Sequence, residues 1–271
     1  MSSDTFQGRV TDALQGRGVT PPSAAVILPT LGIVASEVAL FYGFPYVSLF
    51  GHLITLAGCV FAPLATTRDL PMFQVFALVP VFRLVNLGMP VFFELTLYWF
   101  PFVYAPLFPA MFLLVVRHPD LHLDVNLRSA VLLMPAGVLL AAVLGEIEYR
   151  IIEPAALVAE PSVVQFLLLA AVMVLFVGVV EEVLFRGILQ SALVEALGYW
   201  PGMLLASFLF AMMHSAYGTV LEMAFAALVG LVFGVIYTRT RSITLVTVIH
   251  GVLNVFVFGF IPVYGSNVPA L

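Results

Sequence analysis

The sequence contains no lysine, a single cysteine and few charges of either sign. Only 9% of its 271 residues are charged, whereas 62% are hydrophobic and the mean hydropathy is +1.14. A soluble domain has about 25% charged residues, so this chain cannot cover a globule with polar surface. The composition therefore excludes an ordinary soluble protein and predicts a polytopic membrane protein.

The shortage of cysteine and of basic residues excludes two further classes of protein. Cys59 is the only cysteine, so neither a disulfide within the chain nor a thiolate metal cluster can form. The net charge is −5 and the ten basic residues, all arginine, form no basic patch. Nucleic acid is therefore not an expected partner, and membrane lipids are the expected surroundings.

Apolar runs long enough to cross a bilayer predict an all-α helix bundle. A spanning helix needs roughly 20 mostly apolar residues, and eight or nine runs qualify. The fourth run contains Glu94 and three prolines, which predicts a kinked or broken helix. The expected spans are 24–44, 46–66, 71–89, 91–116, 129–146, 162–182, 201–217, 219–238 and 243–262.

The arginines are unequally divided between the two sides of this expected bundle. Cytoplasmic loops of membrane proteins are enriched in basic residues, and a cytoplasmic N-terminus places eight arginines on that side: Arg9, Arg17, Arg68, Arg117, Arg128, Arg186, Arg239 and Arg241. Arg150 then lies outside, within an acidic loop expected at 146–160, and Arg83 lies in a span. We therefore expect a multi-pass protein of the cell membrane whose residues 1–22 form a cytoplasmic tail.

Three late segments place ionisable or amide side chains among apolar residues. They are "EEVLFR" with Glu181, Glu182 and Arg186, "FAMMH" ending in His214, and "HGVLN" with His250 and Asn254. An ionisable group in the middle of a span costs about 2.5–3.5 kcal/mol on insertion scales, so such groups usually face the bundle interior and mark function. These segments are therefore the candidate functional site.

Helical spacing predicts how the members of each segment are arranged. Glu182 and Arg186 are four residues apart with the acid first, the favourable order for an ion pair. Glu181 lies about 100° around the helix, so we expect it to face elsewhere while Arg186 neutralises Glu182. His250 and Asn254 share one helix face. Phe210, one turn before His214, is expected to pack beside its ring.

If three helices bring these side chains together, they can hydrolyse a peptide bond without a covalent intermediate. Glu181 with His214 can take a proton from water, and His250 with Asn254 can donate hydrogen bonds to a developing oxyanion. The expected depths of Glu181 and His214 make this convergence difficult. Glu181 is expected at the cytoplasmic end of the sixth span, followed by an interfacial helix over 183–199. His214, 13 residues beyond Pro201, would then lie about 20 Å deeper.

In this order, the three segments resemble the CPBP superfamily, which includes the type 2 CAAX prenyl proteases (Ras-converting endopeptidases) and bacteriocin-processing or immunity proteins. The resemblance covers about residues 165–260. The expected N-terminal spans over 23–160 carry no part of the signature. The resemblance implies a catalytic helical core over 161–265 and a cavity open to the cytosol. It also implies that Glu181 and His214 activate water, that His250 and Asn254 form an oxyanion hole, and that Glu182, Arg186 and Phe210 support them.

The resemblance further implies an intramembrane endopeptidase without a cofactor, acting on a peptide or protein that carries a prenyl group in some members of the family. Two alternatives stay open. Glu181, His214 and His250 are possible zinc ligands of a metalloendopeptidase, although the H-E-x-x-H pattern is absent. The second alternative is that the chain is a non-catalytic scaffold, immunity protein or transporter.

Other polar residues have structural explanations as good as functional ones. The segment "RHPDLHLD" offers His118, Asp120, His122 and Asp124 as metal ligands or forms an ordinary loop. Arg83 is expected to pair with Glu94 or to line the cavity. Glu37 and Glu222 also lie within expected spans, where either can bond to a neighbouring helix, and nothing nearby in the sequence assigns them a role.

Overall fold

The computed structural model of the chain describes residues 23–65, 70–91, 96–118, 121 and 123–265. Within these ranges the chain is helical apart from short connections and one isolated bridge between Val125 and Ser242. The prediction of an all-α helix bundle is confirmed.

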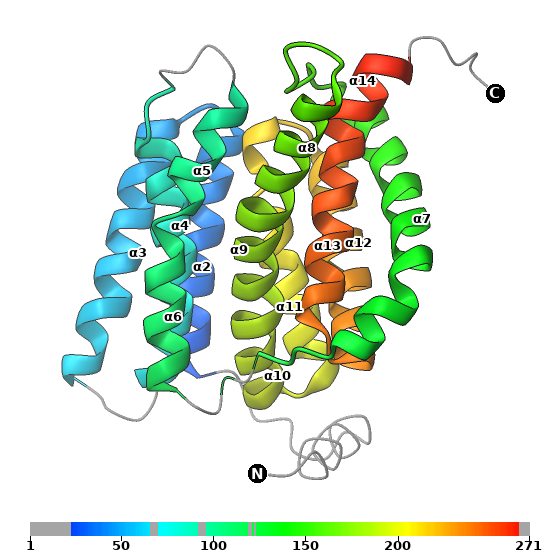
Figure 1. Cartoon of the computed structure of the whole chain (residues 1–271). Helices are drawn as coiled ribbons and strands as arrows, with labels where there is room; N and C mark the ends of the chain where they lie inside the picture. Colours follow the sequence, from blue (N-terminus) through cyan, green and yellow to red (C-terminus); the bar gives the residue numbers. More distant parts are fainter. Residues whose placement is uncertain (1–22, 66–69, 92–95, 119–120, 122, 266–271) are drawn as a thin grey trace.

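The N-terminal helices lie together on one side of the molecule (Figure 1). They are α2 (Ala24–Phe41), α3 (Pro45–Ala65), α4 (Leu70–Gly88), the 3-10 turn η1 (Thr96–Tyr98), α5 (Trp99–Tyr104) and α6 (Leu107–Arg117). The break between α5 and α6 falls among the prolines of the fourth apolar run, as the sequence predicts.

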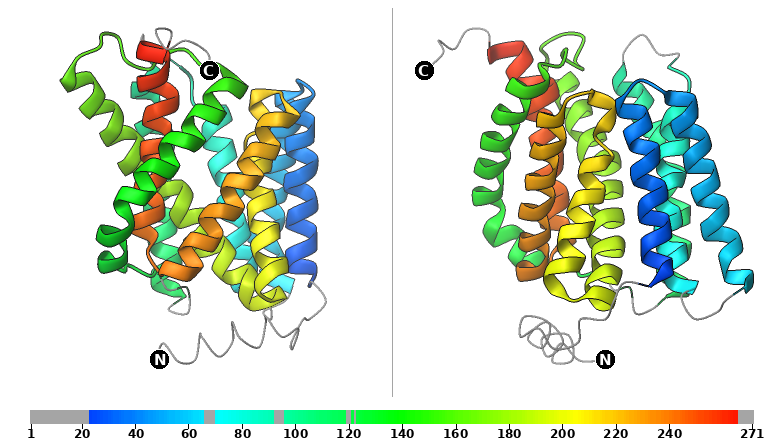
Figure 2. Two further views of the ribbon diagram at one scale, coloured as in Figure 1. Left: turned by 90° about the vertical axis from the view of Figure 1, so that its right-hand side faces the viewer. Right: turned by 180° about the vertical axis from the view of Figure 1, so that it is seen from behind.

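The remaining helices form the other side of the bundle. They are α7 (Leu127–Ile152), α8 (Val163–Val172), the π-helical η2 (Met173–Gly178), α9 (Val179–Glu182), the π-helical η3 (Val183–Gln190), α10 (Ser191–Leu197), α11 (Tyr199–Met212), the 3-10 turn η4 (Ser215–Tyr217), α12 (Val220–Thr240), α13 (Ile243–Val255), the π-helical η5 (Phe256–Phe260) and α14 (Ile261–Tyr264). Figure 2 shows both groups from two further directions, with α7 and α12 inclined to their neighbours.

Eight of the described helical stretches are long and apolar enough to cross a membrane. This is the lower of the two predicted numbers. The helix expected over 201–217 ends at Met212, and its 14 residues extend for only about 21 Å, less than the roughly 30 Å of hydrocarbon in a bilayer. Large apolar side chains such as Leu28, Leu64 and Leu139 are exposed on the outside, as contact with lipid requires. The protein is therefore a multi-pass membrane protein.

The sixth span differs most from its prediction. It does not end at Glu182, and no interfacial helix follows it, because one continuous helical stretch runs from Val163 to Leu197. The first polar side chains after Glu182 face the protein interior, since Arg186 is 2% and Gln190 is 3% exposed, whereas Glu195 near the end of the stretch is exposed. The stretch ends at Gly198, whose φ of 91° suits a residue without a Cβ atom.

Two further expectations about the loops are wrong for the same kind of reason. Arg186, expected in a cytoplasmic segment, is buried in the bundle. Glu148, expected in an outer loop, lies in α7, which continues to Ile152. Arg128 and Arg241 keep their predicted grouping, because the Arg128 end of α7 lies beside the Arg241 end of α12, where Asn126 donates to the Arg241 carbonyl.

Two glycines let η2 and α13 pack closely beside the site. A Cβ atom on Gly178 would lie 2.7 Å from the carbonyl oxygen of Thr247, and one on Gly251 would lie 2.7 Å from the Cα atom of Val174. Small residues at such contacts are typical of membrane helix pairs. Gly251 follows His250 directly, so this contact fixes the part of α13 that carries the site.

We expect Gly251→Ala to lower the free energy of unfolding by about 1–3 kcal/mol, because backbone atoms must move apart to admit the methyl group. Reversible denaturation in detergent measures this change. Gly58→Ala in α3 is the matched control, since nothing lies within 4 Å of its Cβ position, and alanine there favours the helix. Equal stability of the two variants would contradict the close packing.

Candidate active site

Glu182 lies at the centre of a buried network. Its Oε1 atom is 3.0 Å from Nη1 of Arg186 and 2.6 Å from Nδ1 of His250, and Glu182 itself is fully buried. The Arg186 guanidinium also lies over the ring of Phe210, 4.2 Å from its centroid. The predicted ion pair between Glu182 and Arg186 is thus present.

Glu181 faces a different direction, as the 100° offset predicts. The Tyr104 hydroxyl donates a hydrogen bond of 2.6 Å to its Oε1 atom, and Nε2 of His250 lies 3.8 Å from its Oε2 atom. The two glutamates form the turn α9 between the π-helical segments η2 and η3. Such π-helical turns are frequent at functional sites.

His214 follows the last residues of α11, at the end of that helix. Its Nδ1 atom lies 3.0 Å from the Phe210 carbonyl oxygen, so Nδ1 carries a proton and donates it to this bond. Nε2 is then the nitrogen available for other partners. The His214 ring packs on Phe210, with centroids 4.8 Å apart, and stacks with Tyr217, which fulfils the expected packing beside Phe210.

The predicted difference in depth between Glu181 and His214 is absent. About 24 Å of helix separates Glu181 from the end of α10, and about 22 Å separates His214 from the start of α11. Since α10 and α11 join at Gly198, the two side chains reach similar depths. Because the helix continues to Leu197, Glu181 lies deeper than the sequence suggested.

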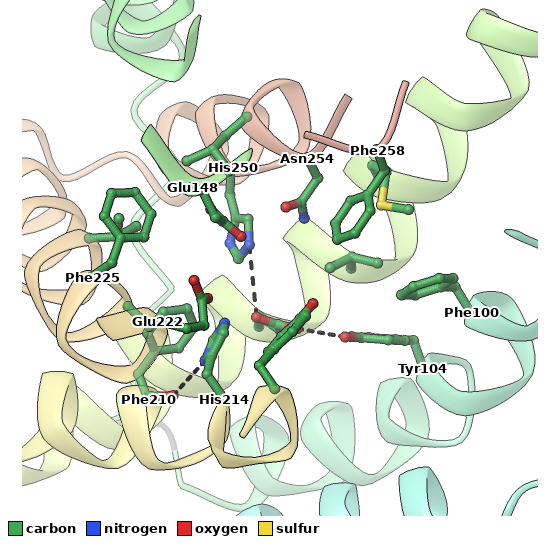
Figure 3. A pocket seen from close by; sticks show the side chains of 17 residues that line it. Phe100, Tyr104, Glu148, Phe210, His214, Glu222, Phe225, His250, Asn254 and Phe258 are labelled. Atoms are coloured by element: carbon green, nitrogen blue, oxygen red, sulfur yellow. Dashed lines mark hydrogen bonds and ion pairs between the residues drawn. The ribbon is translucent and has the colours of Figure 1, made fainter. Parts of the chain in front are cut away.

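The four side chains expected to carry out catalysis, Glu181, His214, His250 and Asn254, border one cavity of about 70 Å³. A cavity of this size has room for more than one water molecule. His250 and Asn254 enter from α13, opposite His214 at the end of α11 (Figure 3). The other residues that line the cavity are Phe100, Tyr104, Glu148, Met173, Val177, Phe210, Tyr217, Glu222, Phe225, Ala226, Val229, Leu253 and Phe258.

A second buried network holds the chain on both sides of His214. Arg83 donates to both carboxylate oxygens of Glu37, at 2.7 and 2.9 Å, and also to the carbonyl oxygen of Met213 at 2.5 Å. The hydroxyl of Ser215 donates to Glu37 at 2.6 Å. The N-terminal helices α2 and α4 thus bind the residue before His214 and the residue after it.

This network bears on two of the expectations for the N-terminal spans. Arg83 pairs with Glu37, whereas the expected partner Glu94 lies outside the described residues. Glu37 does bond to a neighbouring helix, as predicted, and His52 of α3 also lies 3.1 Å from its Oε1 atom. A pairing across 46 positions in sequence has no local pattern that would reveal it.

Most of the other lining residues were not assigned to the site from the sequence, among them Tyr104, Glu148 and Glu222. Tyr104 is one of many aromatic residues in apolar segments, so nothing marked it. Glu148 was placed in a loop. Glu222 was noted at membrane depth but given no role, although its place in an apolar helix was the available signal.

Neither of the two candidate metal sites has a complete ligand set among the described residues. No group of three His, Cys, Asp or Glu side chains is arranged there to hold a metal ion, including the zinc alternative of Glu181, His214 and His250. In the second candidate, Asp120 and His122 lie outside the described residues. His118 contacts Gln74, and Asp124 pairs with Arg241 at 2.9 Å.

Comparison with known proteins agrees with the motifs. The family described as type II CAAX prenyl endopeptidase Rce1-like matches residues 163–256, which contain all three segments. No curated protein and no solved structure matches the chain. The resemblance drawn from the motifs is confirmed: residues 163–256 of this membrane protein match the Rce1-like family of CAAX proteases.

Proposed function

We propose that the chain is an intramembrane endopeptidase in which Glu181 and His214 activate a water molecule for attack on a peptide bond. The observation that carries this proposal is that Glu181, His214, His250 and Asn254, from three separate stretches of chain, border one cavity. The family match supports a CAAX-type protease. The substrate is then a membrane-bound peptide or protein cut near its C-terminus.

The hydrogen bonds of the proposed base orient it towards the cavity. Tyr104 occupies one oxygen of Glu181, and the Phe210 carbonyl fixes the Nδ1 proton of His214. An oxygen of Glu181 and Nε2 of His214 are left to accept a proton from water. The resulting hydroxide adds to the substrate carbonyl carbon, and the proton passes to the amide nitrogen as the C–N bond breaks.

The opposite wall of the cavity supplies donors for the oxyanion. The Asn254 carboxamide can donate directly. His250 donates Nδ1–H to Glu182, so its Nε2 can donate to an oxyanion only when the ring is the imidazolium. Glu182 is the buried anion that such a cation requires, and Arg186 holds Glu182 in place. This explains why the site contains two adjacent glutamates with different partners.

The proposed orientation follows from the distribution of arginine, and the proposed side of access follows from the resemblance to the CPBP superfamily. With the N-terminus in the cytoplasm, most arginines lie in cytoplasmic segments. We propose this orientation in the cell membrane and a substrate that enters the cavity from the cytosol.

The direct test is cleavage by the purified protein in detergent. A farnesylated CAAX peptide, the same peptide without the farnesyl group and an unrelated apolar peptide would be incubated in water labelled with ¹⁸O. We expect mass spectrometry to show cleavage of at least the farnesylated peptide, with one ¹⁸O atom in the new carboxyl group. Failure of a folded sample to cleave any of the three would favour a scaffold, immunity or transport function.

Metal removal separates the two proteolytic mechanisms. We expect the cleavage rate to change less than about twofold after dialysis against EDTA and 1,10-phenanthroline, because general acid–base catalysis by Glu181 and His214 uses no metal. Loss of activity, restored by added zinc and not by magnesium, would instead support Glu181, His214 and His250 as zinc ligands.

A further inference from the structure

A second pair of acids borders the cavity and takes no part in the chemistry described above. Glu148 comes from α7 and Glu222 from α12. Figure 3 shows them on the side of the cavity away from Tyr104 and Phe100. Glu148 is 8% exposed and Glu222 is fully buried.

Glu222 is the unusual member of this pair. Neither of its carboxylate oxygens has a hydrogen-bond partner within the described part of the chain. A buried carboxylate without a partner is costly, and such groups normally bind a cation or a donor. No arginine is among the residues that line the cavity, so the described residues offer the pair no fixed counter-charge there.

Helix capping does not account for Glu222. The sequence Thr219-Val220-Leu221-Glu222 fits a capping box, in which the glutamate would accept a hydrogen bond from the backbone N–H of the threonine. The Thr219 hydroxyl does accept the Glu222 N–H at 3.1 Å, but the Glu222 carboxylate makes no return bond. The side chain instead lines the cavity, while the N-terminal end of α12 favours its negative charge.

We propose that Glu148 and Glu222 form a binding subsite for a basic side chain, lysine or arginine, of the peptide substrate. The ring of Phe225, one turn after Glu222, lines the same side of the cavity and adds an aromatic face that attracts cations. A metal ion is a poorer occupant, because no described group of three potential ligands surrounds the pair. The position of this subsite beside the scissile bond rests on the proposed function.

Binding is tested without any cleavage. The thermal stability of the purified protein would be measured with n-butylammonium chloride, which reproduces the end of a lysine side chain, and with n-butanol and sodium chloride at the same concentrations. We expect a higher melting temperature with butylammonium alone and loss of that increase in Glu222→Gln. Glu146→Gln is the control, since this glutamate of α7 is exposed and pairs with Arg150, and it should retain the increase.

Specificity is tested with pairs of peptides that differ only in lysine or norleucine near the cleaved bond. We expect kcat/KM for the lysine peptide to exceed that for the norleucine peptide by tenfold to a hundredfold, as a hydrogen-bonded charge typically provides. In Glu222→Gln, the ratio should fall close to one whatever the absolute rate of the variant.

The outcomes distinguish the subsite from the proposed function. A melting temperature raised equally by sodium or butanol, or a lysine preference unchanged in Glu222→Gln, would overturn the subsite. Stabilisation by butylammonium that depends on Glu222, in a folded protein that cleaves no peptide, would support the subsite and count against the endopeptidase.

Discussion

Replacing Glu181 with glutamine is expected to lower the rate of peptide cleavage by roughly 10²–10⁴-fold, the usual contribution of a general base. The amide keeps the size of the side chain and can still accept the hydrogen bond from Tyr104, so the cavity should keep its shape. It cannot take a proton from water. The loss should therefore appear in kcat, measured with a peptide that the wild-type protein cleaves, while KM changes little.

Two comparisons make this result specific. Glu146→Gln removes the same charge from an exposed position on α7 and should leave the rate within about twofold, as an exposed substitution usually does. Because Glu181 and His214 are proposed to act on one water, the double variant Glu181→Gln/His214→Ala should be little worse than either single variant. If the rate losses of the two single variants multiplied in the double variant, or if Glu181→Gln kept the wild-type kcat, a shared role of Glu181 and His214 would be contradicted.

The pattern within single helices could be read from the sequence, because helix geometry fixes it. The spacing of Glu182 and Arg186 predicted an ion pair that the structure contains, and the spacing of Phe210 and His214 predicted a ring contact that it also contains. The membership of Glu181, His214, His250 and Asn254 in one cavity was likewise anticipated from the cost of polar groups at membrane depth. Their catalytic roles stay predictions.

The depth of Glu181 could not be read in the same way. Hydropathy suggested that the sixth span ends where charges begin, but Glu182 and Arg186 neutralise each other inside the bundle, so the helix continues to Leu197. The contribution of Tyr104 and the pairing of Arg83 with Glu37 depend on contacts between helices that are far apart in sequence. Only the packed structure determines these partners.

Breaking the buried network of Arg83 and Glu37 is expected to have a large effect on stability. We expect Arg83→Met to lower the free energy of unfolding by about 3–5 kcal/mol, because it leaves the carboxylate of Glu37 buried without its cation. Both side chains are almost fully buried, so solvent cannot replace the lost partner. Reversible unfolding in detergent would give the change. Arg150→Met is the matched control, since it breaks an exposed pair with Glu146 that contributes about 0–1 kcal/mol.

The same variant should also affect catalysis through the position of His214. Arg83 donates to the carbonyl of Met213, so the residue before His214 loses its anchor. Glu37, which accepts from Ser215, loses the cation that holds it in place. We expect kcat to fall about tenfold or more while KM stays within a few fold, because a displacement of about 1 Å in a reacting group has a large effect on rate. Arg83 is thus a positioning residue, since it does not line the cavity.

The double variant Arg83→Met/Glu37→Met separates stability from positioning. Removing both members of a buried ion pair and replacing them with apolar side chains is often neutral or stabilising, so much of the lost free energy of unfolding should return. In the double variant the anchors of Met213 and Ser215 are both absent, so kcat should stay low. If kcat instead recovered together with stability, the network would only stabilise the fold, and the N-terminal helices would have no part in placing His214 for catalysis.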